Sequence, residues 1–538
     1  MKKAKLWCGA CLTALIGAMA LTSCAGGNDG KDVYDKNNRL IINFRNVYFE
    51  QWNGEDNYTE ILNNQFGVKI KATSYSYGSW DTQIGTAING NNLSDVNQFN
   101  LKHYNFGASY EKWVGYGMLK PLPDDLSKWP NIQNMINNTS NIDYLKIDGK
   151  LYCIPVANDI TNPHKDFSNM TYVYRRDWAK QLGLYKENDI YTWDEFLALL
   201  AGFKENIVSL SGIKQSNVLV DEGWGFPSIA NFYKNAPHCY DVDSTGKAIN
   251  AFTSPEYIEG LKATKSLIDA GIYSHDQRQW DEKSSNATTN YLGGKAAVLY
   301  DNFTFTNYLK LRNNFRSQRK AFTDEALDDG TAFLKVIGPD GKYALENDEN
   351  WFSITMFNYK ISDTKLEKVL DILDYLLTED GTYLGIYGQK DYDYTVDPVT
   401  GKIVLNEMSW EKNVNTGEYA PRTNGAKYLR YVATLGHDTK SYDPYTDLHA
   451  YDLFTKWDED MKTAKAEDKL RIIVEPANVC WMSTPTKNSR TKALLDTAKL
   501  RAADFCYGEL NESKYISQVE GLNGYKDAIN EINAKLGK

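Results

Sequence analysis

Aromatic side chains are the feature of this sequence that points most clearly to a chemistry. The chain contains 13 Trp and 37 Tyr among its 538 residues, and both side chains join a flat apolar face to a polar edge. A sugar ring is divided in the same way, with C–H bonds on its faces and hydroxyls around its rim. Aromatic side chains in irregular segments, together with polar side chains at predicted strand ends, give ten candidate ligand contacts: Trp52, Asn97, Gln98, Trp224, Phe226, Trp280, Asp301, Asn302, Trp351 and Trp481.

Four of these candidates come at the ends of predicted strands. Asn97 and Gln98 follow the LSDV strand, and Asp301 and Asn302 end the strand in GKAAVLYDN. Ligands of α/β proteins bind beside the carboxyl ends of parallel strands, where amide and carboxylate groups can bond the hydroxyls of a solute. A second interpretation stays open, because Asn and Asp at strand ends also form turns and caps, and a tryptophan is often a packing residue.

Motifs for catalysis or metal binding do not stand out. No G-x-S-x-G or H-E-x-x-H motif occurs, and the six histidines lack the paired spacing of metal ligands. We therefore predict no catalytic residue, no metal and no cofactor, although 70 acidic residues do not exclude a glycosidase carboxylate pair. Residues 241–252 begin like a calcium loop, but Phe252 replaces its bidentate glutamate. A turn is predicted there, and a structural calcium is left open.

The first 23 residues have the pattern of a secretory signal, with three lysines before a short apolar run. The run of about 16 residues is short for a membrane-spanning helix, which needs roughly 20. Its end, LTSC, resembles the lipobox of bacterial lipoproteins, which implies that Cys24 is acylated, as by palmitate, and becomes the first mature residue. A plain signal or an uncleaved anchor is the alternative. Residues 24–38 are rich in Gly, Asn and Asp and predict a flexible tether.

The remainder of the chain is large and acidic. The net charge of −10 becomes −13 when the three lysines of the signal are removed. An acidic balance without a basic patch argues against a nucleic-acid partner, and the length permits two or three domain-sized units. The pairing of Cys153, Cys239, Cys480 and Cys506 is left open, because export permits a disulfide and buried thiols fit equally well.

Apolar spacing predicts the elements that position these residues. RLIINFRNVYF and GVKIKATSYSY read as strands on either side of a helical piece, a β-α-β unit with parallel strands. A helix is predicted over YTWDEFLALLAGFK, where Thr192 and Glu195 form a capping box, and another over DTKLEKVLDILDYLLTEDG. GPDGKY (338–343) and DPVTGK (397–402) predict hairpins.

Six segments follow one another along the chain: NGNNLSDVNQF, GYGMLKPLPDDL, DGKLYCIPVAND, YVYRRDWAKQLGL with the helix that follows it, GKAAVLYDN and LGIYGQKDYDYTVD. In the same order, they resemble segments of the extracellular solute-binding proteins of ABC importers. Ser94 departs from that pattern, because the family usually has Pro there. The sequence is similar to the large carbohydrate-type binding lipoproteins of Gram-positive bacteria, the LipO-like proteins.

The resemblance implies an α/β, two-lobed fold of the type II periplasmic-binding-protein kind, with hinge strands and a ligand cleft between the lobes. Transferred to this chain, the N-terminal lobe comprises residues 39–157 plus 301–350. The C-terminal lobe comprises residues 158–300 plus 351–538. The strand that ends at Asn302 is then expected to return to the first lobe.

The function implied by the resemblance is capture of an oligosaccharide outside the cytoplasm and its delivery, unaltered, to an ABC import permease. The protein would be a monomer without enzyme activity, held by lipid on Cys24 to the outer face of the cytoplasmic membrane, with the transmembrane subunits of the permease as partners. Two alternatives are a surface-anchored glycan-degrading enzyme and a receptor for a non-sugar solute such as a peptide. The sequence does not specify the length or linkage of the sugar.

Overall fold

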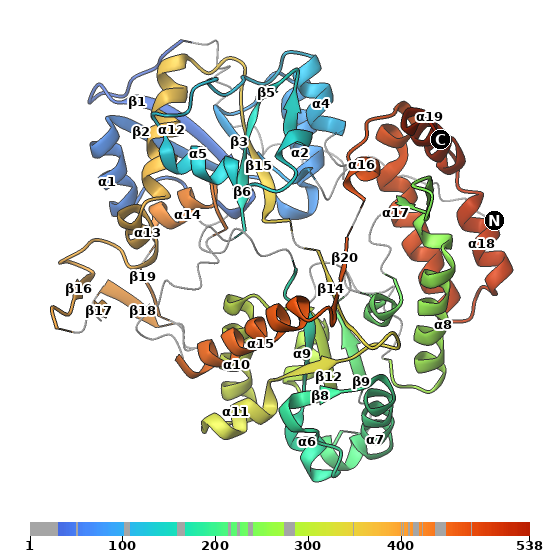
Figure 1. Cartoon of the computed structure of the whole chain (residues 1–538). Helices are drawn as coiled ribbons and strands as arrows, with labels where there is room; N and C mark the ends of the chain where they lie inside the picture. The colour runs from blue at the N-terminus through green and yellow to red at the C-terminus, as the bar shows by residue number, and fades with distance from the viewer. Residues whose placement is uncertain are drawn as a thin grey trace, which may run out of the picture.

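The computed structural model of the chain is organised around two sheets. It describes residues 31–49, 52–101, 108–158, 167–213, 217–222, 226–234, 240–273, 286–347, 349–399, 401, 403–406, 409–412, 419–421, 423–435, 448–474 and 476–538. Within these residues, strands form two five-stranded sheets, seen as an upper and a lower lobe in Figure 1. None of the described helices has both the length and the apolar character needed to cross a membrane. The predictions for residues 1–23, Cys24, Trp224, Cys239 and Trp280 lie outside the described residues.

The first-lobe sheet has the strand order β2-β1-β3-β15-β6. Strands β1, β2 and β3 are parallel, whereas β15 runs antiparallel to β3 and to β6. Helix α1 (Asn57–Phe66) connects β1 to β2, which confirms the predicted β-α-β opening. The strands are β1 (Leu40–Asn46), β2 (Val68–Ser74), β3 (Val96–Phe99), β6 (Cys153–Ala157) and β15 (Trp351–Phe357).

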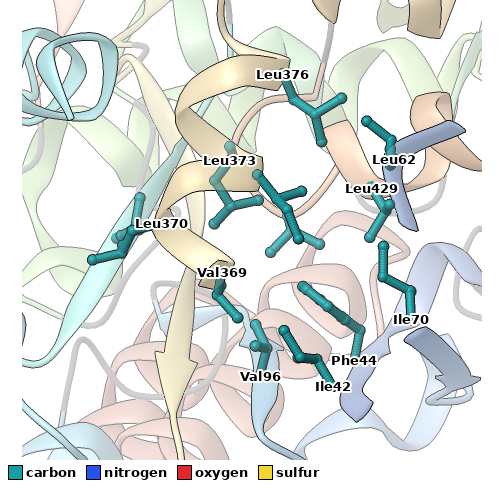
Figure 2. Packing of buried hydrophobic residues seen from close by; sticks show 14 of the residues in the cluster. Ile42, Phe44, Leu62, Ile70, Val96, Val369, Leu370, Leu373, Leu376 and Leu429 are labelled. Atoms are coloured by element: carbon teal, nitrogen blue, oxygen red, sulfur yellow. The ribbon is translucent and has the colours of Figure 1, made fainter. Parts of the chain in front are cut away.

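The core of the first lobe lies between this sheet and a predicted helix. Figure 2 shows apolar side chains of β1, β2 and β3 meeting those of α12 (Asp363–Leu376). Burying one such aliphatic side chain stabilises the fold by about 1.5–3 kcal/mol. The other helices of this lobe are α2 (Trp80–Asn89), α4 (Ala108–Gly115), α5 (Pro130–Asn137), α13 (Glu379–Ile386) and α14 (Gly425–Arg430).

The second-lobe sheet has the order β8-β13-β7-β12-β9. Strand β12 is parallel to β9, and β7 is antiparallel to both β12 and β13. The strands are β7 (Met170–Tyr174), β8 (Ile190–Tyr191), β9 (Asn217–Asp221), β12 (Ala296–Asn302) and β13 (Ala332–Val336). Its helices are α6 (Arg176–Gln181), α7 (Trp193–Ser211), α9 (Asn286–Leu292), α10 (Phe305–Arg319), α11 (Asp324–Gly330) and α15 (Leu448–Ala466).

The capping box that begins α7 is confirmed. The Thr192 amide donates to Glu195 Oε2 over 3.0 Å, and the Glu195 amide donates to Thr192 Oγ1 over 3.4 Å. Both hydrogen bonds satisfy amides that lack a partner inside the first helical turn.

A C-terminal helical group packs beside the second lobe (Figure 1). Its core also takes in the hairpin of β10 (Tyr240–Val242) and β11 (Ala248–Asn250), so the turn predicted within residues 241–252 is confirmed. Asp243 accepts hydrogen bonds from Thr245 and Lys247 in this turn. The helices of the group are α8 (Pro255–Asp269), α16 (Ala477–Cys480), α17 (Pro485–Cys506), α18 (Glu512–Glu520) and α19 (Tyr525–Leu536).

Short strand pairs complete the fold. Residues 397–402 connect β16 (Tyr394–Val396) to β17 (Ile403–Leu405), and these two strands form the predicted hairpin. The hairpin predicted at 338–343 is wrong, because β13 pairs with β7 and β8 while β14 (Tyr343–Glu346) pairs in parallel with β20 (Leu470–Ile473). Two further antiparallel pairs are β4 (Lys146–Ile147) with β5 (Lys150–Leu151) and β18 (Trp410–Lys412) with β19 (Tyr419–Pro421).

The predicted lobe boundaries differ from the sheets in two places. Residues 301–347 were assigned to the first lobe, but β12 is an inner strand of the second sheet and β13 joins the same sheet. Residues 351–435 were assigned to the second lobe, but β15 is an inner strand of the first sheet and α12 supplies its core. The assignment was wrong because it took β12 for the strand that returns to the first lobe. The chain returns later, between Glu346 and Trp351.

The tether prediction is also wrong for residues 32–38. Ile41 donates its amide to the Val33 carbonyl over 2.8 Å, and Tyr34 forms an antiparallel bridge with Leu40. Asp35 accepts from the amide and the guanidinium of Arg39. These contacts attach the segment to the start of β1, despite its polar composition.

Candidate functional site

The chain passes from the first sheet to the second after β6 and returns between β14 and β15, so one edge of each sheet lies at the boundary between the lobes (Figure 1). The Asn158 amide donates to the Asn350 carbonyl over 2.9 Å at the first-lobe end, and the Ser168 amide donates to the Glu346 carbonyl over 2.8 Å at the second-lobe end. Since β15 begins where β1 and β3 end, and β7 begins where β9 and β12 end, the carboxyl ends of parallel strands face each other. Ligands of α/β proteins bind at such edges.

The first-lobe edge, called the neutral edge, consists of Asn46, Tyr48, Gln98 and Tyr431. Gln98 Nε2 and Asn46 Nδ2 donate to the Tyr431 carbonyl over 2.9 and 3.4 Å. The rings of Tyr48 and Tyr431 lie 5.2 Å apart, and both are half-buried. Gln98 Oε1 is buried and has no hydrogen-bond partner among the described residues. The edge therefore combines two half-buried tyrosine rings with two buried side-chain amides, one of which retains an unused acceptor.

Asn97 was predicted beside Gln98, but its side chain points elsewhere. Its Oδ1 accepts from the Tyr75 hydroxyl over 2.8 Å, and its Nδ2 donates to the Ser94 carbonyl over 2.8 Å. The residue is fully buried. Both polar groups of this amide are thus used inside the first lobe.

The second-lobe edge, called the acidic edge, consists of Glu222, Thr288 and Asp301. Thr288 donates its amide and hydroxyl to Glu222 Oε1 over 3.2 and 2.9 Å. Its hydroxyl also lies 3.5 Å from Asp301 Oδ2. Burial, followed by the nearby charge of Glu222, raises the pKa of Asp301 to about 7. Two carboxyl groups at strand ends are thus held together by one threonine.

Two neighbours of the acidic edge have different roles. Asp221 lies beneath it, where burial raises the pKa to about 7, and it accepts from the hydroxyls of Tyr273 and Ser228. Asn302 ends β12 as predicted and is half-buried, and its carbonyl accepts from Asn307 Nδ2 over 2.8 Å. Asp221 therefore bonds side chains of the interior, whereas Asn302 borders the edge.

Three predicted tryptophans and Phe226 are packed in this structure. Trp52 stacks on Tyr428 with ring centroids 5.6 Å apart, and its Nε1 donates to Asp56 over 2.6 Å. Trp351 is buried and donates to the Ser140 carbonyl over 3.0 Å. The other two side chains also pack on aromatic rings. Trp481 packs on Trp351 and Tyr144, and Phe226 packs between Tyr273 and Tyr507.

Five residues of the two edges were not predicted from the sequence, and one of them, Asn46, is the last residue of β1. Tyr48 and Glu222 follow β1 and β9 almost directly, so the strand-end rule that selected Gln98 would have found them. Tyr431 and Thr288 carry no such signal, because each reaches its edge from a helix that is distant in sequence or in a different layer.

The described residues contain no group of three side chains suited to bind a metal ion. Cys153, Cys480 and Cys506 are buried thiols that are not paired with one another. Burial raises the pKa of Cys153 to about 12, which suppresses the reactive thiolate.

The fold has two lobes, and strand ends of the two sheets face each other at their boundary. Residues 57–307 match the family described as bacterial extracellular solute-binding protein.

Individual proteins are also similar to this chain. Lipoprotein LipO of Bacillus subtilis (strain 168) is 26% identical over 378 residues, which cover 65% of this chain and 69% of LipO. The alginate-binding protein AlgQ2, in a crystal structure without calcium ion, has a TM-score of 0.63 at 14% identity and covers 93% of this chain and 98% of its own. An HMO-binding solute-binding protein from Bifidobacterium longum infantis has a TM-score of 0.62 at 14% identity, covering 92% and 98%. These structural likenesses confirm the two-lobed fold.

Proposed function

We propose that this protein is a lipid-anchored receptor that captures an oligosaccharide outside the cytoplasm and delivers it to an ABC import permease. The observation that carries the proposal is the pair of facing sheet edges, one neutral and aromatic, the other acidic. Both end in groups that can bond sugar hydroxyls, and both belong to lobes connected by side-by-side crossings.

Binding and closure are coupled in this account. A solute contacts both edges only when the lobes close around it, so the closed form gains contacts that the open form lacks. Tyr48 and Tyr431 would cover the C–H face of a sugar ring, Gln98 Oε1 would accept one hydroxyl, and the acidic edge would accept others. A sugar that lacks one of these hydroxyls leaves a buried acceptor unpaired, which costs about 1–3 kcal/mol.

The neutral edge favours a carbohydrate over a peptide, because it combines tyrosine rings with side-chain amides. The described fold is similar to proteins named for binding alginate and HMO, and those names support a sugar ligand for this chain. Peptide sites also use aromatic rings, so peptide binding is the competing outcome of the test below.

The lipid anchor is proposed from the sequence LTSC at Cys24 and from the similarity to a lipoprotein. It would hold a monomer at the outer face of the cytoplasmic membrane of a Gram-positive cell, near its permease. The permease would distinguish the closed form from the open form, and the solute would pass on unaltered.

Thermal-shift measurements against panels of oligosaccharides and peptides test the proposed ligand class. We expect Tm to rise with at least one oligosaccharide, which mass spectrometry then recovers intact. A rise with peptides alone would contradict the sugar assignment, and cleaved products would contradict the receptor.

The anchor is tested separately by expressing the chain with Cys24→Ala in a Gram-positive host. We expect wild-type protein to incorporate labelled palmitate and to sediment with membranes, and the variant to do neither. Equal labelling of both forms would contradict acylation at Cys24.

A further inference from the structure

We propose that one end of the first lobe is a membrane-contact surface that rests against lipid headgroups. This end, called the outer pole, is the sheet edge where β1, β2 and β3 begin, opposite the edge that faces the second lobe. The inference rests on the proposed lipid anchor at Cys24 and concerns how the anchored protein is oriented.

The chain leaves the first lobe at the outer pole. The Ser362 hydroxyl, just before α12, donates to Asp32 Oδ1 over 2.5 Å, and Val33 is bonded to Ile41 at the start of β1. Eight residues lead from Cys24 to Asp32. Since an extended chain spans at most about 3.6 Å per residue, the anchor lies within roughly 29 Å of the pole. The proposed lipid would therefore keep this end of the first lobe within reach of the bilayer.

Two exposed tyrosines lie at the same pole. The exposed fraction of Tyr116 is 68%, and that of Tyr359 is 40%. Their segments run side by side, because the Tyr359 amide donates to the Met118 carbonyl over 3.1 Å and the Lys120 amide donates to the Phe357 carbonyl over 3.0 Å. Since β15 ends at Phe357, both rings lie beyond the outer edge of the sheet.

Each of these tyrosines has a lysine over its ring. Lys112 Nζ lies 5.7 Å from the ring centroid of Tyr116, and Lys360 Nζ lies 5.7 Å from that of Tyr359. Tyrosine and lysine both suit the boundary between a bilayer and water, because each has an apolar body and a polar end. The ammonium groups would also meet anionic headgroups. In a chain with a net charge of −10, these two pairs at the chain exit are complementary to an anionic membrane.

Contact at the outer pole would set a resting orientation. The neutral edge lies at the other end of the first lobe, and the acidic edge faces it from the second lobe, so both would point away from the bilayer and stay open to solute. Delivery to a permease would then require the first lobe to leave the bilayer and tilt within the reach of its tether.

The test uses residues 25–538 with a hexahistidine tag at the position of the lipid. The protein is attached to vesicles of phosphatidylglycerol and phosphatidylcholine that contain a nickel-chelating lipid, and hydrogen exchange is compared with that of the protein released by imidazole. We expect slower exchange on vesicles in residues 112–119 and 357–361. This protection should be lost in the Tyr116→Ser, Tyr359→Ser double variant.

Tyr185→Ser is the matched control. Tyr185 is an exposed tyrosine with Lys180 Nζ 5.6 Å from its ring centroid, but it belongs to the second lobe. This variant should keep the protection of the outer pole, and all variants should keep the Tm of the parent chain. Protection that persists in the double variant, or that is equal around Tyr185, would overturn the proposal. Because the tag imposes attachment, these results do not depend on acylation of Cys24 or on the identity of the solute.

Discussion

The two edges that face each other differ in chemistry and in how the chain assembles them. The neutral edge combines amides with tyrosine rings and joins Asn46 to Tyr431 across 385 positions of the sequence. The acidic edge places two carboxyl groups around Thr288, which lies 66 positions from Glu222. The difference suggests a division of labour, in which the neutral edge supplies shape and stacking and the acidic edge accepts hydroxyl donors. The four predictions that follow test this division.

The largest expected effect comes from a buried ion pair in the first lobe, at the end of the sheet opposite the neutral edge. Asp95 lies at the start of β3, is buried with Lys365 and accepts the amide of Asn43 over 2.8 Å. Asp95→Ala leaves a buried ammonium group without its partner, which should lower the free energy of unfolding by about 3–5 kcal/mol. Chemical denaturation measures this loss.

Glu367→Ala is the control for that variant. Glu367 lies on the same helix as Lys365, but its ion pair with Lys128 is exposed on both sides, and such pairs contribute about 0–1 kcal/mol. Equal losses from the two variants would contradict a special role of the buried pair.

The next effect separates the two edges by affinity. Once an oligosaccharide ligand is known, Gln98→Ala and Glu222→Ala should each weaken its binding by about tenfold, because each removes a hydrogen-bond partner of a buried hydroxyl. Calorimetric titration measures the change, with Gln133→Ala on α5 as a control outside both edges. If only one edge variant lost affinity, the solute would be held by one lobe.

The acidic edge should also make stability depend on pH. Asp301 has a pKa raised to about 7 in the folded protein, against about 3.9 when unfolded. The folded protein therefore binds more protons between these values, and its stability falls as pH rises through about 4 to 7. Asp301→Asn removes this contribution of Asp301.

Thermal melts of the Asp301→Asn variant check this sign. We expect the Tm of the variant, relative to that of the wild type, to be higher at about pH 8 than at about pH 5. The reason is that burial penalises only the charged aspartate. Asp221 has a similarly raised pKa and should leave a residual slope in the variant. An identical Tm difference at both pH values would contradict the raised pKa of Asp301.

The smallest effect concerns the aromatic pair of the neutral edge. Tyr48→Leu keeps an apolar side chain but removes the ring contact with Tyr431, so we expect ligand affinity to fall by about 0.5–1.5 kcal/mol. Titration with the same ligand measures it. A larger loss than that of Gln98→Ala would mean that stacking dominates recognition.

Much of the fold could be predicted from local signals. The β-α-β opening, the capping box at Thr192 and the apolar face of α12 depend on neighbouring residues, and all are present. The lobe boundaries could not be predicted in this way, because they depend on which sheet β12 and β15 join. That is decided by pairing with strands distant in sequence. Two consecutive strands with suitable turn residues likewise failed to pair around 338–343.

The candidate site was less predictable, for a related reason. The strand-end rule located Gln98 and Asp301, yet it could not tell that Asn97, one residue away, turns its amide toward Tyr75. Alternate residues of a strand point to opposite faces, so a one-residue difference decides the role. The role of a tryptophan was harder to predict, because core packing and ligand stacking use the same apolar ring.

Small-angle X-ray scattering during titration with an oligosaccharide panel tests the central claim most directly. If the two edges close on a shared solute, a member of the panel that binds should reduce the radius of gyration as it saturates the protein. Saturation by an oligosaccharide with no change in the radius of gyration would contradict closure of the lobes around the solute.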